Sequence, residues 1–177
     1  MDLVTRQYAQ TVSYLGALDQ IQFVLDTVHK TMEDGGTFQD FKNLIERDGI
    51  DLSRHHLNNI FRTNIQNAYA RGRWEHQQSN KEKRPYLMYW AIEDSRTRPT
   101  HLKLHRIIRH IDDPFWKTFY PPNGFQCRCG VRALTQKQAE RLGITPDDKL
   151  PDFTPDKGWS FHPESYSEHP RRLLESR

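Results

Sequence analysis

Apolar residues recur at three- and four-residue intervals early in the chain, which is the spacing of one face of an α-helix. Asp34, Gly35 and Gly36 follow this stretch, and glycine readily adopts the backbone conformation found just after a helix. The pattern predicts one long amphipathic helix over residues 3–33, packed either on the following helices or on a neighbouring chain. Its apolar stripe consists of Val4, Tyr8, Val12, Leu15, Leu18, Leu25 and Val28.

Two more helices are predicted before the middle of the chain. Thr37 can cap the first of them, with Asp40 in its first turn, and Gly49 ends it. Asp51 or Ser53 caps the second, which we expect to fade from Gly72 into a polar loop over residues 76–84. The apolar face of this last helix consists of Leu57, Ile60, Phe61, Ile65, Ala68 and Tyr69.

The periodicity changes after Pro85, where aromatic and β-branched residues form a run typical of a strand. We predict a strand over residues 86–93 and two shorter ones at residues 107–108 and 131–134. Segregation of helices and strands indicates an α+β fold, with a helical N-terminal half followed by a small antiparallel sheet with long loops. A sheet this small needs local anchors for its loops.

The C-terminal part contains one more predicted helix. Thr135 and Gln138 form the sequence signature of a capping box, and Gly143 ends the helix. Prolines recur from Ile144 onward, which predicts an irregular tail that Trp159 and Phe161 hold against the body of the protein.

Composition favours a soluble protein of a reducing compartment. Hydrophobic residues make up 35% and charged residues 28% of the 177 residues. There is no apolar run long enough for a bilayer and no signal-peptide pattern, so we expect no membrane partner. Two cysteines separated by one residue do not form a disulfide framework.

Charge is unevenly distributed along the chain. Residues 1–53 carry nine acids and four bases, a net charge of −5, whereas residues 54–110 carry twelve bases and four acids, a net charge of +8. The basic stretch is either an ordinary solvated surface or a face that meets an acidic partner or nucleic acid. No nucleic-acid-binding motif accompanies it.

The densest chemistry lies between Trp90 and Cys129. Cys127 and Cys129 flank Arg128, and three alternatives remain open for them. They form a strained disulfide, remain two buried free thiols, or bind Zn²⁺ with His101 and a further ligand. That further ligand would be His105, His110 or Asp94.

Asp94 also has two interpretations. With His101 and His105, spaced four residues apart, it would form a metal-dependent hydrolase or nuclease site. Otherwise it orders its loop by accepting hydrogen bonds from Arg96 or Arg98 and from backbone amides. Asp112, Asp113 and Pro114 predict a turn, with the two acids capping the segment of residues 115–119.

Several enzyme classes are excluded by missing residues. A zinc deaminase needs a glutamate two residues after its histidine, and here His101 is followed at that position by Lys103. There is no glycine-rich phosphate loop and no Gly-x-Ser-x-Gly elbow. Because no complete catalytic constellation is present, the sequence does not predict an enzyme or a small-molecule substrate.

Taken together in order and spacing, these motifs closely resemble the Mu F-like phage head morphogenesis family, the minor capsid proteins of tailed phages and prophages. The matching stretches are residues 94–101, 112–116, 120–125 and 127–129, with Arg62-Thr63 upstream and residues 156–159 downstream. The resemblance covers residues 37–165. It implies a domain over residues 37–170, preceded by a helix over residues 1–36 that could dock on a partner and followed by a tail over residues 171–177.

The resemblance also implies a role. Such a protein is made in the bacterial cytoplasm and packaged in the interior of the head near the portal, where it acts in head assembly and in DNA packaging or ejection. Portal and major capsid proteins would be its partners, and the basic stretch would meet packaged DNA. The motif residues carried onto this chain are Asp94, Arg96, Arg98, His101, Pro121, Pro122, Cys127 and Cys129.

Overall fold

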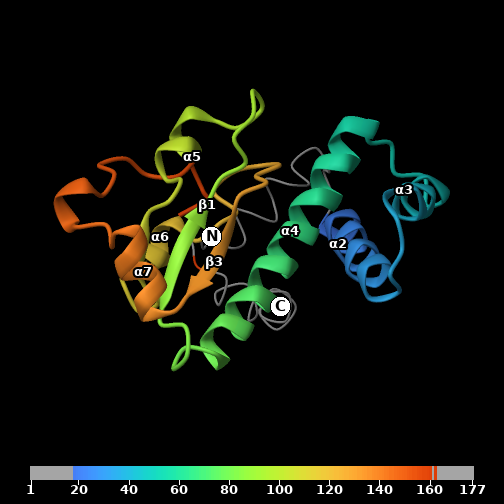
Figure 1. Cartoon of the computed structure of the whole chain (residues 1–177). Coiled ribbons are helices and arrows are strands. Elements are labelled where there is room, and N and C mark those ends of the chain that lie inside the picture. Colours follow the sequence, from blue (N-terminus) through green and yellow to red (C-terminus); the bar gives the residue numbers. More distant parts are fainter. Residues whose placement is uncertain (1–17, 161, 163–177) are drawn as a thin grey trace. The chain divides into compact units, whose positions relative to one another are not determined.

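The structure is a computed structural model, and it describes residues 18–160 and His162 (Figure 1). The first fifteen residues of the long helix predicted over residues 3–33 lie outside this part. The α+β fold is confirmed, and no described helix has the length and apolar character needed to cross a membrane. The elements in chain order are α2 (Leu18–Glu33), α3 (Phe38–Arg47), α4 (Arg54–Ser79), β1 (Tyr86–Trp90), α5 (Pro99–Lys103), β2 (Ile108–His110), α6 (Phe115–Phe119), β3 (Gly130–Leu134), α7 (Gln136–Leu142) and a 3₁₀ turn (Asp147–Lys149).

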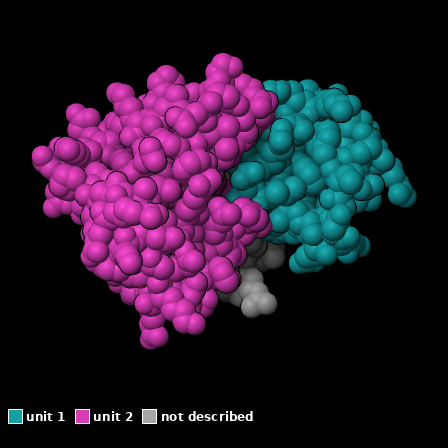
Figure 2. Space-filling model, in the orientation of Figure 1, with its two compact units in different colours: residues 1–66 teal, residues 67–177 magenta. Residues whose placement is uncertain are grey.

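The chain divides into two compact units, Met1–Gln66 and Asn67–Arg177, coloured separately in Figure 2. The boundary between them falls inside α4. The first unit contains α2, α3 and the first half of α4, and its core is formed by side chains from all three helices. These core residues are Val24, Val28, Phe41, Ile45, Ile50, Leu57, Ile60 and Phe61.

The predicted start of α3 is confirmed. The hydroxyl of Thr37 accepts a hydrogen bond from the backbone N–H of Asp40, and the Asp40 carboxylate accepts one from the Thr37 N–H at 2.8 Å. This reciprocal capping box satisfies two backbone donors that a helix start otherwise leaves unpaired. Val24 and Val28 of α2 are buried in the core of its own unit. For the described part of this helix, the expected packing on the following helices is therefore the one observed.

Helix α4 is longer than predicted. It continues through Gly72 to Ser79, so residues 76–79 are helical and not part of a loop. A glycine inside a helix costs about 0.5–1 kcal/mol relative to alanine. Beyond it, however, Trp74 joins Ala70 in the core of the second unit, and Gln77 is also buried. Tertiary packing of this face outweighs the local propensity.

The sheet has the order β2-β1-β3, with both neighbours antiparallel to β1. Alternate residues of β1 enter two different cores, as the two-residue repeat of a strand requires. Leu87 and Tyr89 face the larger core together with the later turns of α4, whereas Met88 faces the smaller core together with Ala139 of α7. Figure 1 accordingly shows the sheet between α4 and α7. The predicted strand over residues 86–93 ends earlier, at Trp90, because the N–H of Ala91 donates to His105 Nδ1.

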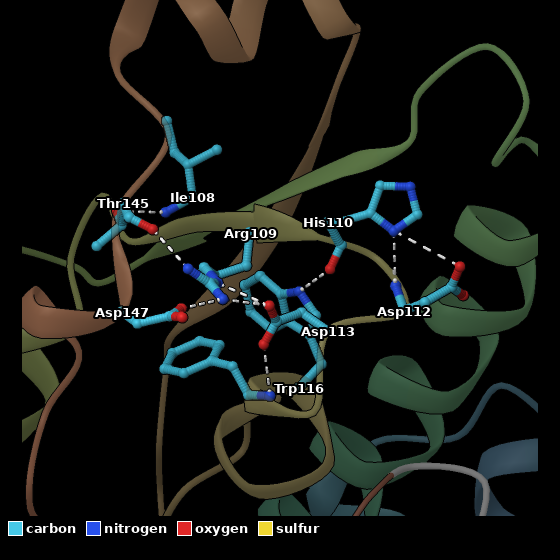
Figure 3. A network of polar contacts seen from close by, with 9 residues as sticks. Ile108, Arg109, His110, Asp112, Asp113, Trp116, Thr145 and Asp147 are labelled. Atoms are coloured by element: carbon cyan, nitrogen blue, oxygen red, sulfur yellow. Dashed lines mark hydrogen bonds and ion pairs between the residues drawn. The ribbon is translucent and has the colours of Figure 1, made fainter.

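The outer edge of β2 is closed by later segments of the chain (Figure 3). Ile108 donates its N–H to the Thr145 hydroxyl and accepts from the Thr145 N–H. Arg109 holds the same segment, because its guanidinium donates to the Thr145 carbonyl at 2.7 Å and pairs with Asp113 and Asp147. Of the two acids predicted to cap residues 115–119, Asp113 accepts the Phe115 N–H, whereas Asp112 pairs with Lys81.

Side chains from α4 and the following turn cover the outer edge of β3. The Val131 carbonyl accepts hydrogen bonds from Arg73 and Gln77, each at 3.3 Å, and the Ala133 carbonyl accepts one from Arg84 at 3.1 Å. A strand edge with satisfied carbonyls is a poor template for pairing with another chain. The three-stranded sheet is therefore closed on both sides.

The segment after β3 follows the prediction closely. Thr135 and Gln138 form the capping box of α7, and Gly143, with a φ of 90°, ends the helix. Beyond the 3₁₀ turn the chain is irregular, and Trp159 is buried. Phe161, which we also expected to pin this tail, lies outside the described residues.

Replacing Gln77 with alanine should lower the free energy of unfolding by about 1–3 kcal/mol, the cost of leaving buried polar groups unpaired. The Gln77 carboxamide accepts from the Tyr120 hydroxyl at 2.9 Å and donates to Val131, so its loss leaves the buried Tyr120 hydroxyl without this partner. Urea denaturation measures the change.

The matched control is Glu75→Ala, on the same helix, which removes an exposed ion pair with Arg71. Exposed pairs contribute only about 0.2–1 kcal/mol, so the control should change stability less. Equal losses for the two variants would contradict the proposed anchoring of the last turn of α4.

Candidate metal centre

Three loop segments of the second unit supply the candidate residues. Asp94 follows β1, His101 lies on the single-turn helix α5, and both cysteines lie just before β3. Pro99 begins α5, where a proline is favoured because its missing N–H has no helical partner in any case. The Pro121–Pro122 bond is cis, and both prolines are buried.

His101, Cys127 and Cys129 come together. The Nδ1 atom of His101 lies 3.6 Å from Cys127 Sγ and 3.7 Å from Cys129 Sγ, and all three potential ligand atoms lie within 4.8 Å of one another. Zinc bonds of about 2.0–2.1 Å to nitrogen and 2.3 Å to sulfur, at tetrahedral angles, place nitrogen and sulfur about 3.6 Å apart. The two nitrogen–sulfur distances therefore match those of a zinc tetrahedron, a spacing that a hydrogen bond to sulfur also has.

The group is enclosed, and its cysteines are free. His101 and Cys127 are each 3% exposed, and Cys129 is partly buried. His101 Nε2 is buried without a hydrogen-bond partner. Two sulfurs and one imidazole are a donor set that suits Zn²⁺. The residues present thus fit a zinc ion in both chemistry and spacing.

The two thiols influence each other's ionisation. A hydrogen bond from Cys127 lowers the pKa of Cys129 to about 7. The same contact, together with burial, raises the pKa of Cys127 well above its ordinary value. The contact therefore favours ionisation of Cys129 before Cys127, and a metal would bind in exchange for the protons that the two thiols still hold.

Arg128 anchors the segment before β3 that carries both cysteines. Its guanidinium donates to both Asp94 oxygens, at 2.8 and 2.5 Å, and to the Thr97 hydroxyl. The Asp94 carboxylate also accepts the N–H of Arg96, whose own guanidinium is mostly exposed. Hydrogen bonding to Arg128 holds the pKa of Asp94 well below its usual range. Asp94 is thus the anchor of its loop.

Arg98 does not pair with Asp94. It donates to the Phe125 carbonyl at 3.0 Å and forms an ion pair with Asp156. A Cβ atom at Gly124 would collide with the Asp156 carboxylate, so glycine is needed where this later segment crosses the loop. Phe125 and Trp159 stack edge to face beside it. Residues 156–159, which matched the family motif, thus pack against the loop that precedes the cysteines.

The structure does not bring the other proposed metal ligands to this group. Helix α5 ends at Lys103, so His105 does not share a helical face with His101. His105 Nδ1 instead accepts the Ala91 N–H at 3.1 Å, and its Nε2 lies 3.7 Å from Glu93. His110 lies beside Asp112. A hydrolytic set of Asp94, His101 and His105 is therefore not assembled among the described residues.

Sequence reasoning placed Arg128, Asn123 and Asp156 in the matching motif but predicted none of their contacts, and it did not predict the role of Tyr89. The Tyr89 hydroxyl donates to Asn123 Oδ1 at 2.8 Å, and it also interacts with the Cys129 sulfur, which helps to lower the pKa of that thiol. Only Arg128 had a local signal. It lies between the two cysteines, and when two such residues face one side of an extended chain, the residue between them faces the other side. The remaining contacts join positions more than thirty residues apart.

The fold and this site define a small α+β domain whose loops close around one histidine and two cysteines. The model of the phage Mu protein F like family matches residues 22–132, which is more than half of the chain and includes all three residues of the group. The chain belongs to this family, and the resemblance found in the sequence motifs is confirmed.

Two curated proteins are similar to it. The putative capsid assembly protein F of Escherichia phage Mu is 29% identical over 209 aligned residues, which cover 89% of this chain and 48% of that protein. The Mu-like prophage FluMu F protein of Haemophilus influenzae is 45% identical over 92 residues, covering 52% of this chain and 22% of that protein. The chain thus spans about half or less of the length of these relatives. No solved structure matches it.

Replacing Asp94 with asparagine should destabilise the domain and flatten its acid sensitivity. The folded pKa of Asp94 lies below the unfolded value of about 3.9, so its contribution is complete above that pH and is lost as the pH falls through the folded pKa. Urea midpoints of the native protein and of Asp94→Asn should therefore differ at pH 7 and converge toward pH 3.

Arg96→Gln is the control, because the Arg96 side chain is 76% exposed and lies farther from the Asp94 carboxylate, at 3.5 Å. It should leave the midpoint at pH 7 nearly unchanged. If the difference between native protein and Asp94→Asn were the same at both pH values, the carboxylate would not be the source of the anchoring.

Proposed function

We propose that this chain acts as a structural and interaction component in the assembly of a tailed-phage or prophage head. The observation that carries the proposal is the family match over residues 22–132, joined to a relative named as a capsid assembly protein. The histidine–cysteine group lies inside that match. Its neighbours anchor loops and form no acid–base pair with it, which supports a structural role over hydrolysis.

In its finer form, the proposal is that of a minor capsid protein associated with the virion, in the interior of the head near the portal. It is made in the cytoplasm of the bacterial host. The portal and major capsid proteins are its partners. Within the docking segment of residues 1–36, the residues before α2 make the contact, because α2 itself packs Val24 and Val28 into the core of its own unit. Residues 54–110, with a net charge of +8, contact packaged DNA through phosphates without reading its sequence.

Co-expression of the tagged chain with the portal and major capsid proteins of the same phage tests this proposal. The chain should co-purify with heads and be detected in purified virions by mass spectrometry. A variant lacking residues 1–17 leaves the described core residues in place, and it should fold while co-purifying less. Failure of the full chain to associate with either protein, or its absence from virions, would contradict the assembly role.

We also propose that His101, Cys127 and Cys129 bind one Zn²⁺. The support is the nitrogen–sulfur spacing of 3.6 and 3.7 Å, the burial of the group and its soft donor set. When bound, the ion would replace the protons that the two thiols still hold and join α5 to the segment before β3. The free energy of metal binding would then stabilise the folded domain, because an unfolded chain does not hold the three ligands together.

Metal analysis of the purified protein should find about one zinc per chain, as expected for one site that folds with its metal. Cys127→Ser and Cys129→Ser should each lose it, with a lowered midpoint of thermal unfolding. His105→Ala is the matched control, since His105 lies near the site but contacts Ala91 and Glu93. Native protein that takes up no zinc after reconstitution would leave the cysteines as buried thiols.

A further inference from the structure

The histidine–cysteine group supplies three ligand atoms, and a tetrahedral zinc ion has four positions. Among the described residues, no other His, Cys, Asp or Glu side chain joins His101, Cys127 and Cys129 at ligand spacing. Structural zinc sites are almost always closed by four protein ligands, whereas sites with three protein ligands keep water or another donor in the fourth position. Whether the chain fills the fourth position therefore decides between a closed structural site and an open site that binds water or another donor.

The other polar side chains of this region are already engaged. The Tyr89 side chain is fully buried beside the thiols, where its hydroxyl donates to Asn123 Oδ1 and also interacts with Cys129. The Asp94 carboxylate is held on both oxygens by Arg128, which lies between the cysteines. His105 is turned toward the Ala91 N–H and Glu93.

Two buried nitrogens of this region have no hydrogen-bond partner among the described residues, which indicates that water reaches the surroundings of the group. They are His101 Nε2 and Asn123 Nδ2, on side chains that are 3% and 0% exposed. His101 Nε2 itself faces away from the ion, because Nδ1 is the ligand atom. Buried polar atoms in folded proteins nearly always have a partner, and ordered water frequently supplies it. Cys129 is the most accessible member of the metal-binding group, so it lies on the side from which such a molecule enters.

We propose that the metal site is open: the fourth position of the bound ion is held by water and exchanges with a small neutral donor such as imidazole. This inference rests on the zinc site proposed above. The exchange breaks one metal–oxygen bond, forms one metal–nitrogen bond and releases the water, with no change in oxidation state. The three protein ligands stay in place throughout.

Cobalt substitution provides the test, because Co²⁺ occupies zinc sites and its absorption bands report both the ligands and the geometry. Addition of Co²⁺ to the metal-free native protein should produce tetrahedral ligand-field bands and thiolate charge-transfer bands, saturating at one equivalent. Imidazole added afterwards should shift the ligand-field bands saturably while the thiolate bands keep their intensity, since both cysteines remain bound.

Two variants complete the test. Tyr89→Phe should leave the ligand-field bands without imidazole unchanged, and Arg96→Gln, whose exposed side chain lies away from the cysteines, should respond to imidazole as the native protein does. Native ligand-field bands that imidazole does not shift, or that Tyr89→Phe alters, mean that the chain itself closes the site, and either result overturns the inference. Absence of any cobalt or zinc binding would instead overturn the metal site itself, so the two failures are distinct.

Discussion

The pairing of Arg128 with Asp94 is the contact on which the arrangement of the loops depends. Residues two apart on an extended chain face the same side, and the residue between them faces the other. Both oxygens of Asp94 hold Arg128 toward the loop after β1, while Cys127 and Cys129 both approach His101 Nδ1. A salt bridge on one side of the chain thus accompanies a histidine–cysteine group on the other. The same few residues link β1, α5 and β3.

The local parts of the fold could be predicted from the sequence because their signals are local. Both capping boxes, at Thr37 and Thr135, and the helix end at Gly143 follow from residues within one turn of each other. The end of α4 could not be predicted in this way. Gly72 is locally unfavourable for a helix, and the helix continues past it because Trp74 is buried in the core, which is a tertiary effect. Likewise, the sequence indicated His101 with the two cysteines, but the contact of Arg98 with Asp156 joins residues 58 positions apart.

A three-stranded sheet offers little area for hydrophobic burial, so the long loops are held by polar contacts from arginines. Arg84, Arg98 and Arg109 each donate to a backbone carbonyl, of Ala133, Phe125 and Thr145 respectively. Arginine suits this task because its rigid guanidinium presents several donors at once and stays charged. Part of the basic character of residues 54–110 is therefore structural. The arginines that carry the proposed contact with DNA must be sought among the more exposed ones, such as Arg62, Arg96 and Arg106.

The ionisation of Asp94 argues against a role as general base. A general base works best when its pKa lies near the operating pH, and enzymes raise carboxylate pKa values by burial to achieve this. Here Arg128 does the opposite to Asp94, which stays charged and bound through the whole physiological range. The carboxylate of this motif is consequently optimised to hold a loop in place. Such a fixed loop suits the assembly role proposed above, whereas a proton carrier would need the freedom that Asp94 lacks.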